Sequence, residues 1–527
     1  MSTEQQAGCS IRLTTTPGSA DGLEAQLQVL QVHPRDNVLV ALQPLPAGAA
    51  LPEPFAHLTA SQAIPAGHKV ALQAIAKGQP VIKYGFAIGA ASCAIQAGEQ
   101  VHSHNLTTLL SGQQQYRYQG CEARQPEYPA GLPTEFQGYR RANGKVGTRN
   151  ELWIINTVGC VNRAASRIAE LARKEFADLL AQSSIDGIHA FTHPFGCSQL
   201  GDDLSNTREL LAGLIQHPNA GAVLVLGLGC ENNQLATLLK SSPDIDASRI
   251  RAFNAQQVED EIEQGLAAVG ELLQQMSQDQ RTACPVSELV MGMKCGGSDG
   301  LSGLTANALV GRIADLLAAA NGKVVLTETP EMFGAEQVFM ARASNQQVFD
   351  DLVQLVNDFK QYFIDNQQPV YENPSPGNKE GGLTTLEEKS LGAIQKGGSA
   401  AVQQVIRYGK TVSKAGLTLL EGPGNDAVSS TALTAAGATL LLFTTGRGTP
   451  LGFPAPTVKI SSNSSLAARK PQWIDFDAGG LLRQGQDATE FSHAFFRYLL
   501  DVASGRQTRN EVSDNREIAI WKNGVTL

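Results

Sequence analysis

The sequence has few aromatic and charged residues and no long uninterrupted hydrophobic run. Aromatic side chains make up 6% of the 527 residues and charged ones 17%, whereas hydrophobic residues reach 42%. This balance is typical of a globular protein and excludes the disordered and fibrous classes. No apolar run approaches the ~20 residues that a transmembrane helix needs. The first residues, MSTEQQAGCSIRLTTTPGSADG, contain no hydrophobic signal core, so we expect a cytoplasmic protein without a membrane partner.

Basic residues are also fewer than acidic ones. The chain has 41 lysines and arginines against 50 acidic residues, which gives a formal net charge of −9. An acidic chain offers no electrostatic attraction for nucleic acid, so we expect no such partner. A small anionic substrate is still compatible, because a local pocket need not share the sign of the whole chain. The eight cysteines are widely spaced, which in a large chain without a secretion signal indicates free thiols.

Changes in composition and in the pattern of apolar residues along the chain predict three folded parts, as its length also suggests. Residues 1–25 form an N-terminal extension without a chemical motif. Residues 26–110 contain short β-like runs between glycines and prolines, typical of a small β-rich domain, and residues 111–136 are polar and contain several prolines, as in a linker. We expect two α/β domains to follow, a central catalytic one over residues 137–390 and a C-terminal one over residues 391–527.

Apolar stretches alternate with amphipathic helical ones in these two α/β regions. Strand candidates include ELWIINTVGC, GIHAFTHPFGC, GAVLVLGLGC, ELVMGMKCGG and KVVLTETPEM, and the segments RIAELARKEFADLLAQ and VEDEIEQGLAAVGELLQQM are typical of helices. The alternation predicts mostly parallel sheets that helices cover on both faces. The expected fold is therefore a multidomain α/β protein with a small β-rich domain at its N-terminus.

Two histidines one residue apart stand in the stretch GEQVHSHN. In a strand, the spacing of His102 and His104 puts both side chains on one face. With His68, in PAGHKVAL, they would give three imidazoles, a ligand set that suits a divalent transition metal. The alternative is an exposed strand face with an unrelated third histidine. Lys69 would point to the other face, where we expect a structural role.

Four cysteines stand at or just after the ends of predicted strands, where open parallel sheets bind their ligands. They are Cys160, Cys197, Cys230 and Cys295, and we expect them to face one crevice. Each could equally be a small buried hydrophobic residue. They lack the CxxC pairs of a structural zinc site, but their soft sulfur ligands leave an iron–sulfur or thiolate–iron role open.

Polar residues in several glycine-rich loops could hold a polyhydroxy acid, although each loop could also be an ordinary tight turn. The candidates are Ser298, Asp299, Asn378, Lys379, Asn425, Asp426 and Arg447. Arg447, between two glycines, is the best carboxylate clamp, because a guanidinium binds a carboxylate in a fork. Glu328 and Glu331 at another strand end could act as a base or support a metal ligand, or could simply be carboxylates that a helix N-terminus favours. The stretch VLGLGCEN has Asn232 where a dinucleotide fingerprint needs its third glycine, which argues against an oxidoreductase.

Long stretches of the chain resemble a known family, the altronate/galactarate dehydratases. The matching stretches include GHKVAL, VIKYG, VHSHN, YRRANGKVGTRNELWI, TVGCVN, GCSQLGDD, NAGAVLVLGLGCENNQ, CGGSDGLSG, TETPEMFGAEQ, YENPSPGNKEGGLTTLE and APTVKISSN. Together, such stretches cover almost everything from Gln26 to Leu527. The resemblance implies an N-terminal SAF-type β domain followed by two α/β domains.

The resemblance also implies a hydro-lyase that uses iron(II) or manganese(II). The implied reaction removes water from D-altronate and gives 2-dehydro-3-deoxy-D-gluconate in hexuronate breakdown. Galactarate-specific members carry acidic residues where this chain has HSH, which favours altronate. Galactarate remains an alternative substrate, and so does sulfolactate, the substrate of a related sulfo-lyase. A homo-oligomer is expected only because large metabolic enzymes commonly form one.

This reaction needs a group that removes the C2 proton and groups that stabilise negative charge on oxygen. Our hypothesis assigns the metal to His68, His102 and His104, the substrate carboxylate to Arg447 and the base to Lys379. Ser298, Asp299 and Asn378 would support catalysis, and Asn425, Asp426, Cys160, Cys197, Cys230 and Cys295 would contact the substrate. Cys160, Cys197 and Cys230 form a competing metal set. A sugar-acid binding protein without turnover is the alternative from another class.

Overall fold

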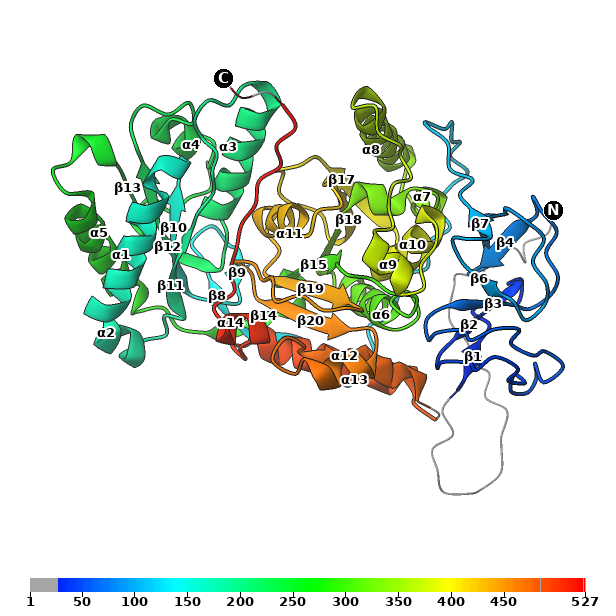
Figure 1. Cartoon of the computed structure of the whole chain (residues 1–527). Helices are drawn as coiled ribbons and strands as arrows, with labels where there is room; N and C mark the ends of the chain where they lie inside the picture. Colours follow the sequence, from blue (N-terminus) through cyan, green and yellow to red (C-terminus); the bar gives the residue numbers. More distant parts are fainter. Residues whose placement is uncertain (1–26, 484, 525, 527) are drawn as a thin grey trace.

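The computed structural model describes residues 27–483, 485–524 and 526. The predicted N-terminal extension, residues 1–25, lies outside the described residues. Three parts lie in a row in Figure 1, with a four-stranded parallel sheet at one end, a seven-stranded parallel sheet in the centre and a β-rich domain at the other end. The expected fold class is confirmed. Within the described residues, no helix has the length and apolar character to cross a membrane.

The β-rich domain consists of two small antiparallel sheets. One has the order β1-β2-β3-β6 and the other the order β4-β5-β7. Their bounds are β1 Val29–Leu30, β2 Val38–Ala41, β3 Lys69–Ala71, β4 Pro80–Lys83, β5 Phe86–Ala91, β6 Gln100–Val101 and β7 Leu106–Thr107. The strands are short because tight turns interrupt them, and Gly67, Gly78 and Gly98 each take a φ of +83° there. The segment 111–134 forms no helix or strand and leads into the next domain.

The middle domain contains a parallel sheet of the order β11-β10-β12-β13. Its strands are β10 Glu151–Asn156, β11 Gly187–Phe191, β12 Ala220–Gly227 and β13 Ile250–Asn254, and its helices are α1 Asn162–Glu175, α2 Ala177–Gln182, α3 Gly201–Ile215, α4 Leu235–Lys240 and α5 Glu261–Met276. Alternate residues of β10 point to opposite faces. Leu152 and Ile154 pack in the cluster of α1 and α5, and Trp153 and Ile155 pack with α3. Burial on both faces explains the continuous apolar run.

A three-stranded antiparallel sheet of the order β14-β8-β9 connects the middle domain to the centre of the molecule. Its strands are β8 Glu135–Arg140, β9 Val146–Gly147 and β14 Thr282–Pro285. Because β8 precedes and β14 follows the four-stranded sheet, the chain enters and leaves the middle domain at one place.

The central domain contains the seven-stranded parallel sheet, in the order β17-β18-β16-β15-β19-β20-β21. Its strands are β15 Val290–Cys295, β16 Lys323–Leu326, β17 Val402–Ile406, β18 Gly416–Leu420, β19 Leu440–Thr445, β20 Thr457–Ser461 and β21 Phe476–Asp477. Its helices are α6 Ala306–Ala319, α7 Glu336–Met340, α8 Gln346–Asp365, α9 Pro376–Glu380, α10 Leu386–Ala393, α11 Asp426–Ala435, α12 Ser464–Arg469, α13 Ala488–Ala503 and α14 Arg509–Val512. Residues of α6, α8 and α13 pack in one core cluster, and α11 packs with α3 in another.

The predicted boundary at residue 390 is wrong. Strands β15 and β16 precede it and β17 to β21 follow it, yet β15 pairs with β19 and β16 pairs with β18 in one sheet. The residues between β16 and β17 form helices and loops that leave the sheet and return to it. The polar segment that suggested a boundary therefore belongs to a long connection between two strands of one sheet. The change of domain follows α5 instead.

A buried ion triad joins the β-rich domain to the central domain. Glu388 of α10 accepts from Lys69 Nζ and from Lys83 Nζ, both at 2.8 Å, and none of the three side chains is exposed. Lys69 Nζ also donates to Gly382 O at 2.8 Å. Burial alone would raise the pKa of Glu388, but the two lysines hold the pKa far below its usual value. The structural role expected for Lys69 is thus confirmed.

Glu388→Gln should lower the free energy of unfolding by about 3–5 kcal/mol, because it leaves two buried ammonium groups without their carboxylate. Glu209→Gln is the matched control, since it removes a carboxylate that pairs with Lys410 at the surface and should cost less than about 1 kcal/mol. Urea unfolding measures both. The difference should shrink as the pH falls below 4.5, where unfolded glutamate takes up a proton. Equal losses in both variants would contradict the anchoring role.

Candidate active site

Loops of the central domain meet the β-rich domain at the carboxyl edge of the seven-stranded sheet. Gly300, after β15, donates its backbone N–H to Gly381 O at 2.8 Å. A Cβ at Gly300 would lie 1.9 Å from Gly67 O, and a Cβ at Gly382 would lie 2.3 Å from the same oxygen. Only glycine permits such an approach. Three segments distant in the sequence thus form one rim, at the edge where open α/β sheets bind ligands.

A series of paired charged side chains, here called the chain of charges, extends from the buried interior toward this rim. Lys294, in β15, is fully buried, and its Nζ donates to a carboxylate oxygen of Glu328 and to Asp426 Oδ1 at 2.8 Å. Glu328 is buried and has a φ of 71°, a left-handed conformation that is costly for a residue other than glycine and occurs at functional sites. The Asp426 side chain is 38% exposed, so it is the member of the chain that solvent or substrate can reach.

Cys295 and Glu331 lie beside this chain of charges. Lys396 Nζ is 2.7 Å from Cys295 Sγ, the thiol donates to Glu331 Oε2 at 3.1 Å, and Lys389 Nζ lies 2.7 Å from Glu331 Oε1. Burial, together with Glu331, raises the pKa of Cys295 to about 12, so the thiol stays protonated at neutral pH. Cys295 is therefore a buried part of the network and not the exposed substrate contact that the sequence predicted.

The two glutamates of TETPEM differ in their proton affinity. Burial and the nearby Glu331 raise the pKa of Glu328 to about 7. Burial would also raise the pKa of Glu331, but Lys389, Lys294 and Lys396 hold it at about 2. One carboxyl of the pair therefore exchanges a proton near neutral pH while the other stays ionised, as in sites of acid–base catalysis.

Cys295, Glu328 and Glu331 also have the spacing of metal ligands. In the part of the chain that the structure describes, they form the one group of three His, Cys, Asp or Glu ligand atoms that lie within 4.8 Å of one another. Three ammonium groups already contact them, however, from Lys294, Lys389 and Lys396. Because these cations balance the carboxylates, we interpret the group as an acid–base network and not as a metal centre.

The predicted strand geometry of His102 and His104 is wrong. Strand β6 ends at Val101 and β7 begins at Leu106, so both histidines lie in the turn between them, and His104 is exposed. His102 instead stacks on His68, with ring centroids 4.9 Å apart. Among the described residues, no group of three ligand atoms within 4.8 Å includes these histidines. The structure brings two of the three imidazoles together and leaves the third outside.

His68 and His102 hold the backbone of helix α9. His68 Nε2 lies 3.1 Å from Glu380 O, and His102 Nε2 lies 2.9 Å from Lys379 O. Gln100 Nε2 lies 2.8 Å from His68 Nδ1. These contacts fit rings that carry a proton on Nε2 and donate it to a carbonyl. Burial lowers the pKa of both histidines, so they are neutral at neutral pH and position the residues around Lys379.

Arg447, in the loop after β19, reaches across to α9. Its guanidinium donates to Glu380 Oε2 at 2.9 Å, and both side chains are largely exposed. Its Nε lies 3.9 Å from the position of a Cβ on Gly377, so the missing side chain leaves room beside the guanidinium. The predicted clamp thus stands at the rim and already holds a carboxylate, in a surface pair that contributes little stability.

Several other predicted residues maintain the shape of the rim. Asp299 accepts hydrogen bonds from Ser302 Oγ and Ser462 Oγ, both at 2.8 Å, and from Asn463 Nδ2 at 3.0 Å. Buried Asn378 donates to Ser298 O at 2.8 Å. These contacts tie together the loops after β15 and β20 and the helix α9, so the side chains of Asp299 and Asn378 are already committed to protein partners.

Asn425 also has a structural task that differs from the predicted substrate contact. Its side-chain oxygen accepts from the backbone N–H groups of Ala427 and Val428, both at 3.1 Å, and caps helix α11. The helix begins with Asp426, so the cap fixes the direction in which this carboxylate meets Lys294. Lys379, the predicted base, is half-buried between Asn378 and Glu380.

The four strand-end cysteines do not share one crevice. Cys160, Cys197 and Cys230 follow β10, β11 and β12 of the four-stranded sheet, and all three are exposed. Cys295 ends β15 of the seven-stranded sheet and is buried. The single crevice was predicted because all four motifs look alike in the sequence, but the strands belong to two sheets.

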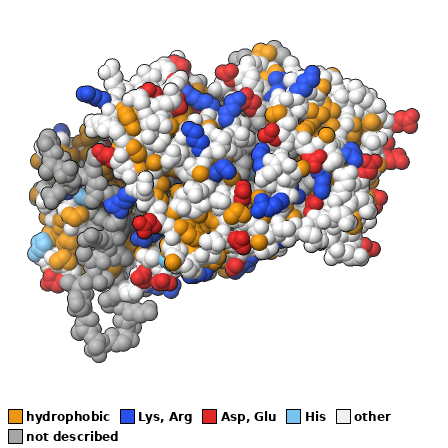
Figure 2. All heavy atoms as spheres, turned by 180° about the vertical axis from the view of Figure 1, so that it is seen from behind, with side chains coloured by type: hydrophobic (Ala, Val, Ile, Leu, Met, Phe, Trp, Pro, Cys, Tyr) orange, Lys and Arg blue, Asp and Glu red, His pale blue; other side chains and the backbone are white. Residues whose placement is uncertain are grey.

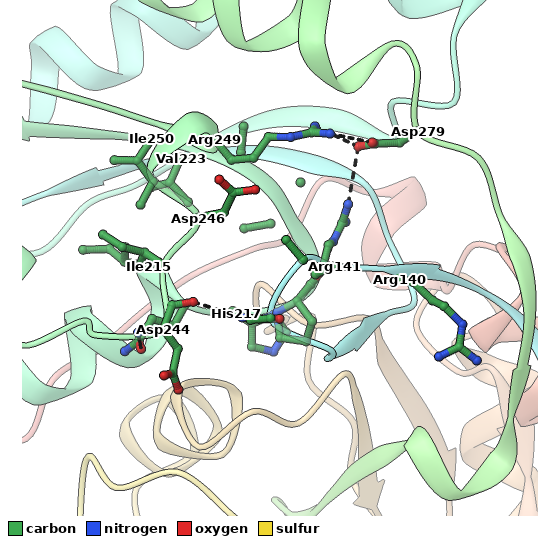
Figure 3. Close-up of a pocket in the computed structure, with 18 residues that line it drawn as sticks. Arg140, Arg141, Ile215, His217, Val223, Asp244, Asp246, Arg249, Ile250 and Asp279 are labelled. Carbon is green, nitrogen blue, oxygen red and sulfur yellow. Dashed lines mark hydrogen bonds and ion pairs between the residues drawn. The ribbon is translucent and has the colours of Figure 1, made fainter.

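A separate cavity of about 130 Å³ lies in the middle domain and contains none of the predicted site residues. Figure 3 shows Arg141 and Arg249 directed at the same carboxylate, Asp279. Arg141 also donates to Asn150 Oδ1 at 3.0 Å and to Pro218 O at 2.8 Å. These charged groups are paired with one another or with the backbone, which favours a structural role for the cavity.

The sequence interpretation missed three lysines of the rim, Lys294, Lys389 and Lys396. One signal was available for Lys294, because it stands inside the apolar run VMGMK, where a charged residue needs a partner. The other two stand on or near α10 and meet Glu331 and Cys295 only in the folded chain.

Comparison with protein families gives three matches that follow one another along the chain. Residues 27–109 match the altronate/galactarate dehydratase SAF domain. Residues 138–277 match the second domain of D-galactarate dehydratase/altronate hydrolase, and residues 286–526 match the C-terminal D-galactarate/altronate dehydratase domain. The last two ranges agree with the change of domain seen after α5.

Individual relatives match over almost their whole length. The chain is 51% identical to altronate dehydratase of Escherichia coli (strain K12), over 95% of this chain and 100% of the relative. It is 48% identical to altronate dehydratase of Bacillus subtilis (strain 168), over 94% and 99%. Galactarate dehydratase (L-threo-forming) of Escherichia coli (strain K12) is 34% identical, over 91% and 93%. With its SAF domain, its two α/β domains and these relatives, the chain belongs to the D-galactarate/altronate dehydratase family.

Proposed function

We propose that this protein removes water from D-altronate and forms 2-dehydro-3-deoxy-D-gluconate, as a step of hexuronate breakdown in the cytoplasm. The observation that carries the proposal is the identity of about half of all aligned residues to two altronate dehydratases, over 100% and 99% of their lengths. Galactarate is the less favoured substrate, since the galactarate dehydratase is 34% identical.

The reaction sets three tasks for the residues at the rim. The substrate carboxylate must be held, the proton on C2 must be removed, and the hydroxyl on C3 must leave with a proton. The enol that results becomes the 2-keto acid. Negative charge develops on oxygen in both bond-breaking steps, so positively charged and proton-donating groups must face the substrate.

Arg447 binds the substrate carboxylate. Its guanidinium matches a carboxylate in a two-pronged hydrogen bond, and its present partner, Glu380, is exposed enough to be replaced. Gly377 beside it leaves the space that the substrate needs.

Lys379 and the Glu328 network share the proton transfers. Lys379 removes the C2 proton, and the two stacked histidines keep its backbone in place through the carbonyls of Lys379 and Glu380. The leaving hydroxyl receives its proton from Asp426. Lys294 supplies that proton to Asp426 and takes a replacement proton from buried Glu328. Glu328 suits this task because its pKa is about 7 and a donor works best near the pH of the reaction.

Iron(II) or manganese(II) is the proposed cofactor, as the resemblance implies. When bound, such an ion acts as a Lewis acid on the oxygens that gain charge. The three predicted histidines do not fit this ion in the described arrangement, since His68 and His102 face carbonyls and His104 stands apart. No step of the mechanism is therefore assigned to a histidine-bound metal.

Turnover tests the proposed function directly. Metal-stripped protein is supplied without oxygen with D-altronate, galactarate or sulfolactate, and iron(II) or manganese(II) is added back. We expect 2-keto acid from D-altronate only when one of the metals is present. Turnover of galactarate or sulfolactate alone would overturn the substrate, and protection against unfolding by D-altronate without any keto acid would indicate a binding protein.

Glu328→Gln should lower kcat by about 10²- to 10⁴-fold, the usual contribution of a positioned acid or base. Glu328 loses its proton as the pH rises through about 7, so wild-type kcat should fall above that pH. The small residual activity of the variant should lack this fall, because glutamine does not titrate. A pH profile of kcat from 5.5 to 9 measures both effects.

Glu421→Gln is the matched control for this prediction. Glu421 follows the neighbouring strand β18 but pairs with Arg407, so its removal should leave the fall near pH 7 in place. Thermal melting of both variants checks that they fold. A profile of Glu328→Gln that still falls near pH 7 would contradict the assigned role.

A further inference from the structure

Three exposed cysteines stand at the carboxyl edge of the four-stranded sheet, whereas the charged rim belongs to the seven-stranded sheet. They follow three adjacent strands, since β11, β10 and β12 are neighbours in the sheet and lead to Cys197, Cys160 and Cys230. The mechanism at the rim makes no use of them. Exposed thiols are chemically reactive groups, so three of them on one edge need an explanation.

Hydrogen bonds connect the three cysteine loops to one another. Gly159 N, next to Cys160, donates to Phe195 O at 2.9 Å, and Asn233 N donates to Gly196 O, next to Cys197, at 2.9 Å. Asn233 Nδ2 also donates to Thr157 O at 3.1 Å. Each loop is thus tied to both others within a few residues of its cysteine, so the three cysteines stand on neighbouring, connected loops.

The surroundings of these loops favour a negatively charged ligand set. Cys160 lies two residues before helix α1, and Cys197 lies four residues before helix α3. The positive ends of both helices therefore lie next to the cysteine loops, where they favour a negatively charged bound group. No disulfide consumes the thiols, since Cys160, Cys197 and Cys230 are all free.

Two further groups at this edge indicate space for a ligand. Asn156 ends β10 and Asn233 follows Cys230, and both residues are completely buried. The Oδ1 atoms of both have no hydrogen-bond partner among the described residues. Buried amide oxygens without a partner are costly, so each could accept a hydrogen bond from a bound water or ligand hydroxyl.

The spacing of the thiols argues against a single metal ion. One ion that binds three thiolates at ~2.3 Å brings their sulfur atoms to within about 4 Å of one another. Among the described residues, the three Sγ atoms do not all lie within 4.8 Å. An iron–sulfur cluster attaches each thiolate to a different iron, so its sulfur ligands stand further apart.

We propose that Cys160, Cys197 and Cys230 bind a [4Fe–4S] cluster at the carboxyl edge of β10, β11 and β12. Three thiolates serve three of the irons and leave the fourth without a protein ligand. Because the loops are exposed, that iron is open to a small oxygen ligand such as water, a hydroxyl or a carboxylate. The proposal does not depend on the proposed function, since it concerns a site on another sheet.

Metal and sulfide analysis of the full chain tests the proposal. Protein purified without oxygen should contain about four irons and about four acid-labile sulfides per chain, with a broad absorption near 400 nm. Each of the variants Cys160→Ser, Cys197→Ser and Cys230→Ser should lose most of the sulfide and of the absorption. Cys93→Ser and Cys121→Ser are the matched controls, because both remove an exposed cysteine elsewhere and should retain the cluster.

The readout is separate from turnover, so a failed assay with D-altronate leaves this test intact. Circular dichroism confirms that each serine variant is folded. Iron or zinc bound without acid-labile sulfide would overturn the cluster. The same loss in the two control variants, or full sulfide content in any of the three serine variants of the edge, would overturn the assignment to these cysteines.

Discussion

The buried pairing of Glu388 with Lys69 and Lys83 is the interaction on which the rest of the site depends. It is made across domains, with the carboxylate on α10 and the two ammonium groups on β3 and β4. Removing three charged groups from water is costly, and their mutual contact, with the hydrogen bonds around it, offsets the cost. The pairing therefore fixes where the SAF domain sits. Once it is in place, Gly67 reaches Gly300 and Gly382, and His68 and His102 reach the carbonyls of α9.

This placement explains what the SAF domain contributes to the site. The SAF domain contributes hydrogen bonds to the backbone around Lys379, and the proposed acid–base groups lie in the central domain. Those groups form a second buried network, in which Lys294, Lys389 and Lys396 hold Glu328, Glu331 and Cys295. In this network burial and Glu331 raise the pKa of Glu328 to about 7 although Lys294 contacts it, whereas the lysines outweigh burial at Glu331 and hold its pKa low. Figure 2 shows acidic and basic side chains interspersed on the surface opposite the view of Figure 1.

The sequence predicted the strands well because burial on both faces of a parallel sheet leaves long apolar runs. It also placed the polar glycine-rich loops at strand ends, and Arg447 lies in the loop after β19. It could not give the order of the strands, since β15 pairs with β19 across more than a hundred residues, and the predicted boundary at residue 390 failed for that reason. The sequence could not give the partners of the buried lysines either. Lys69, Lys83 and Lys294 each stand in an apolar strand, a sign of a buried ion pair, but their carboxylates come from distant helices and loops.

The middle and central domains present two chemically different edges, one with exposed thiols and one with carboxylates, lysines and an arginine. A crystal structure with D-altronate bound to Lys379→Ala, grown without oxygen, decides which edge holds the substrate. Our account predicts the carboxylate of D-altronate on the Arg447 guanidinium, in place of Glu380, with the C3 hydroxyl toward Asp426. D-Altronate bound at the loops of Cys160, Cys197 and Cys230, with the rim unchanged, would contradict the account.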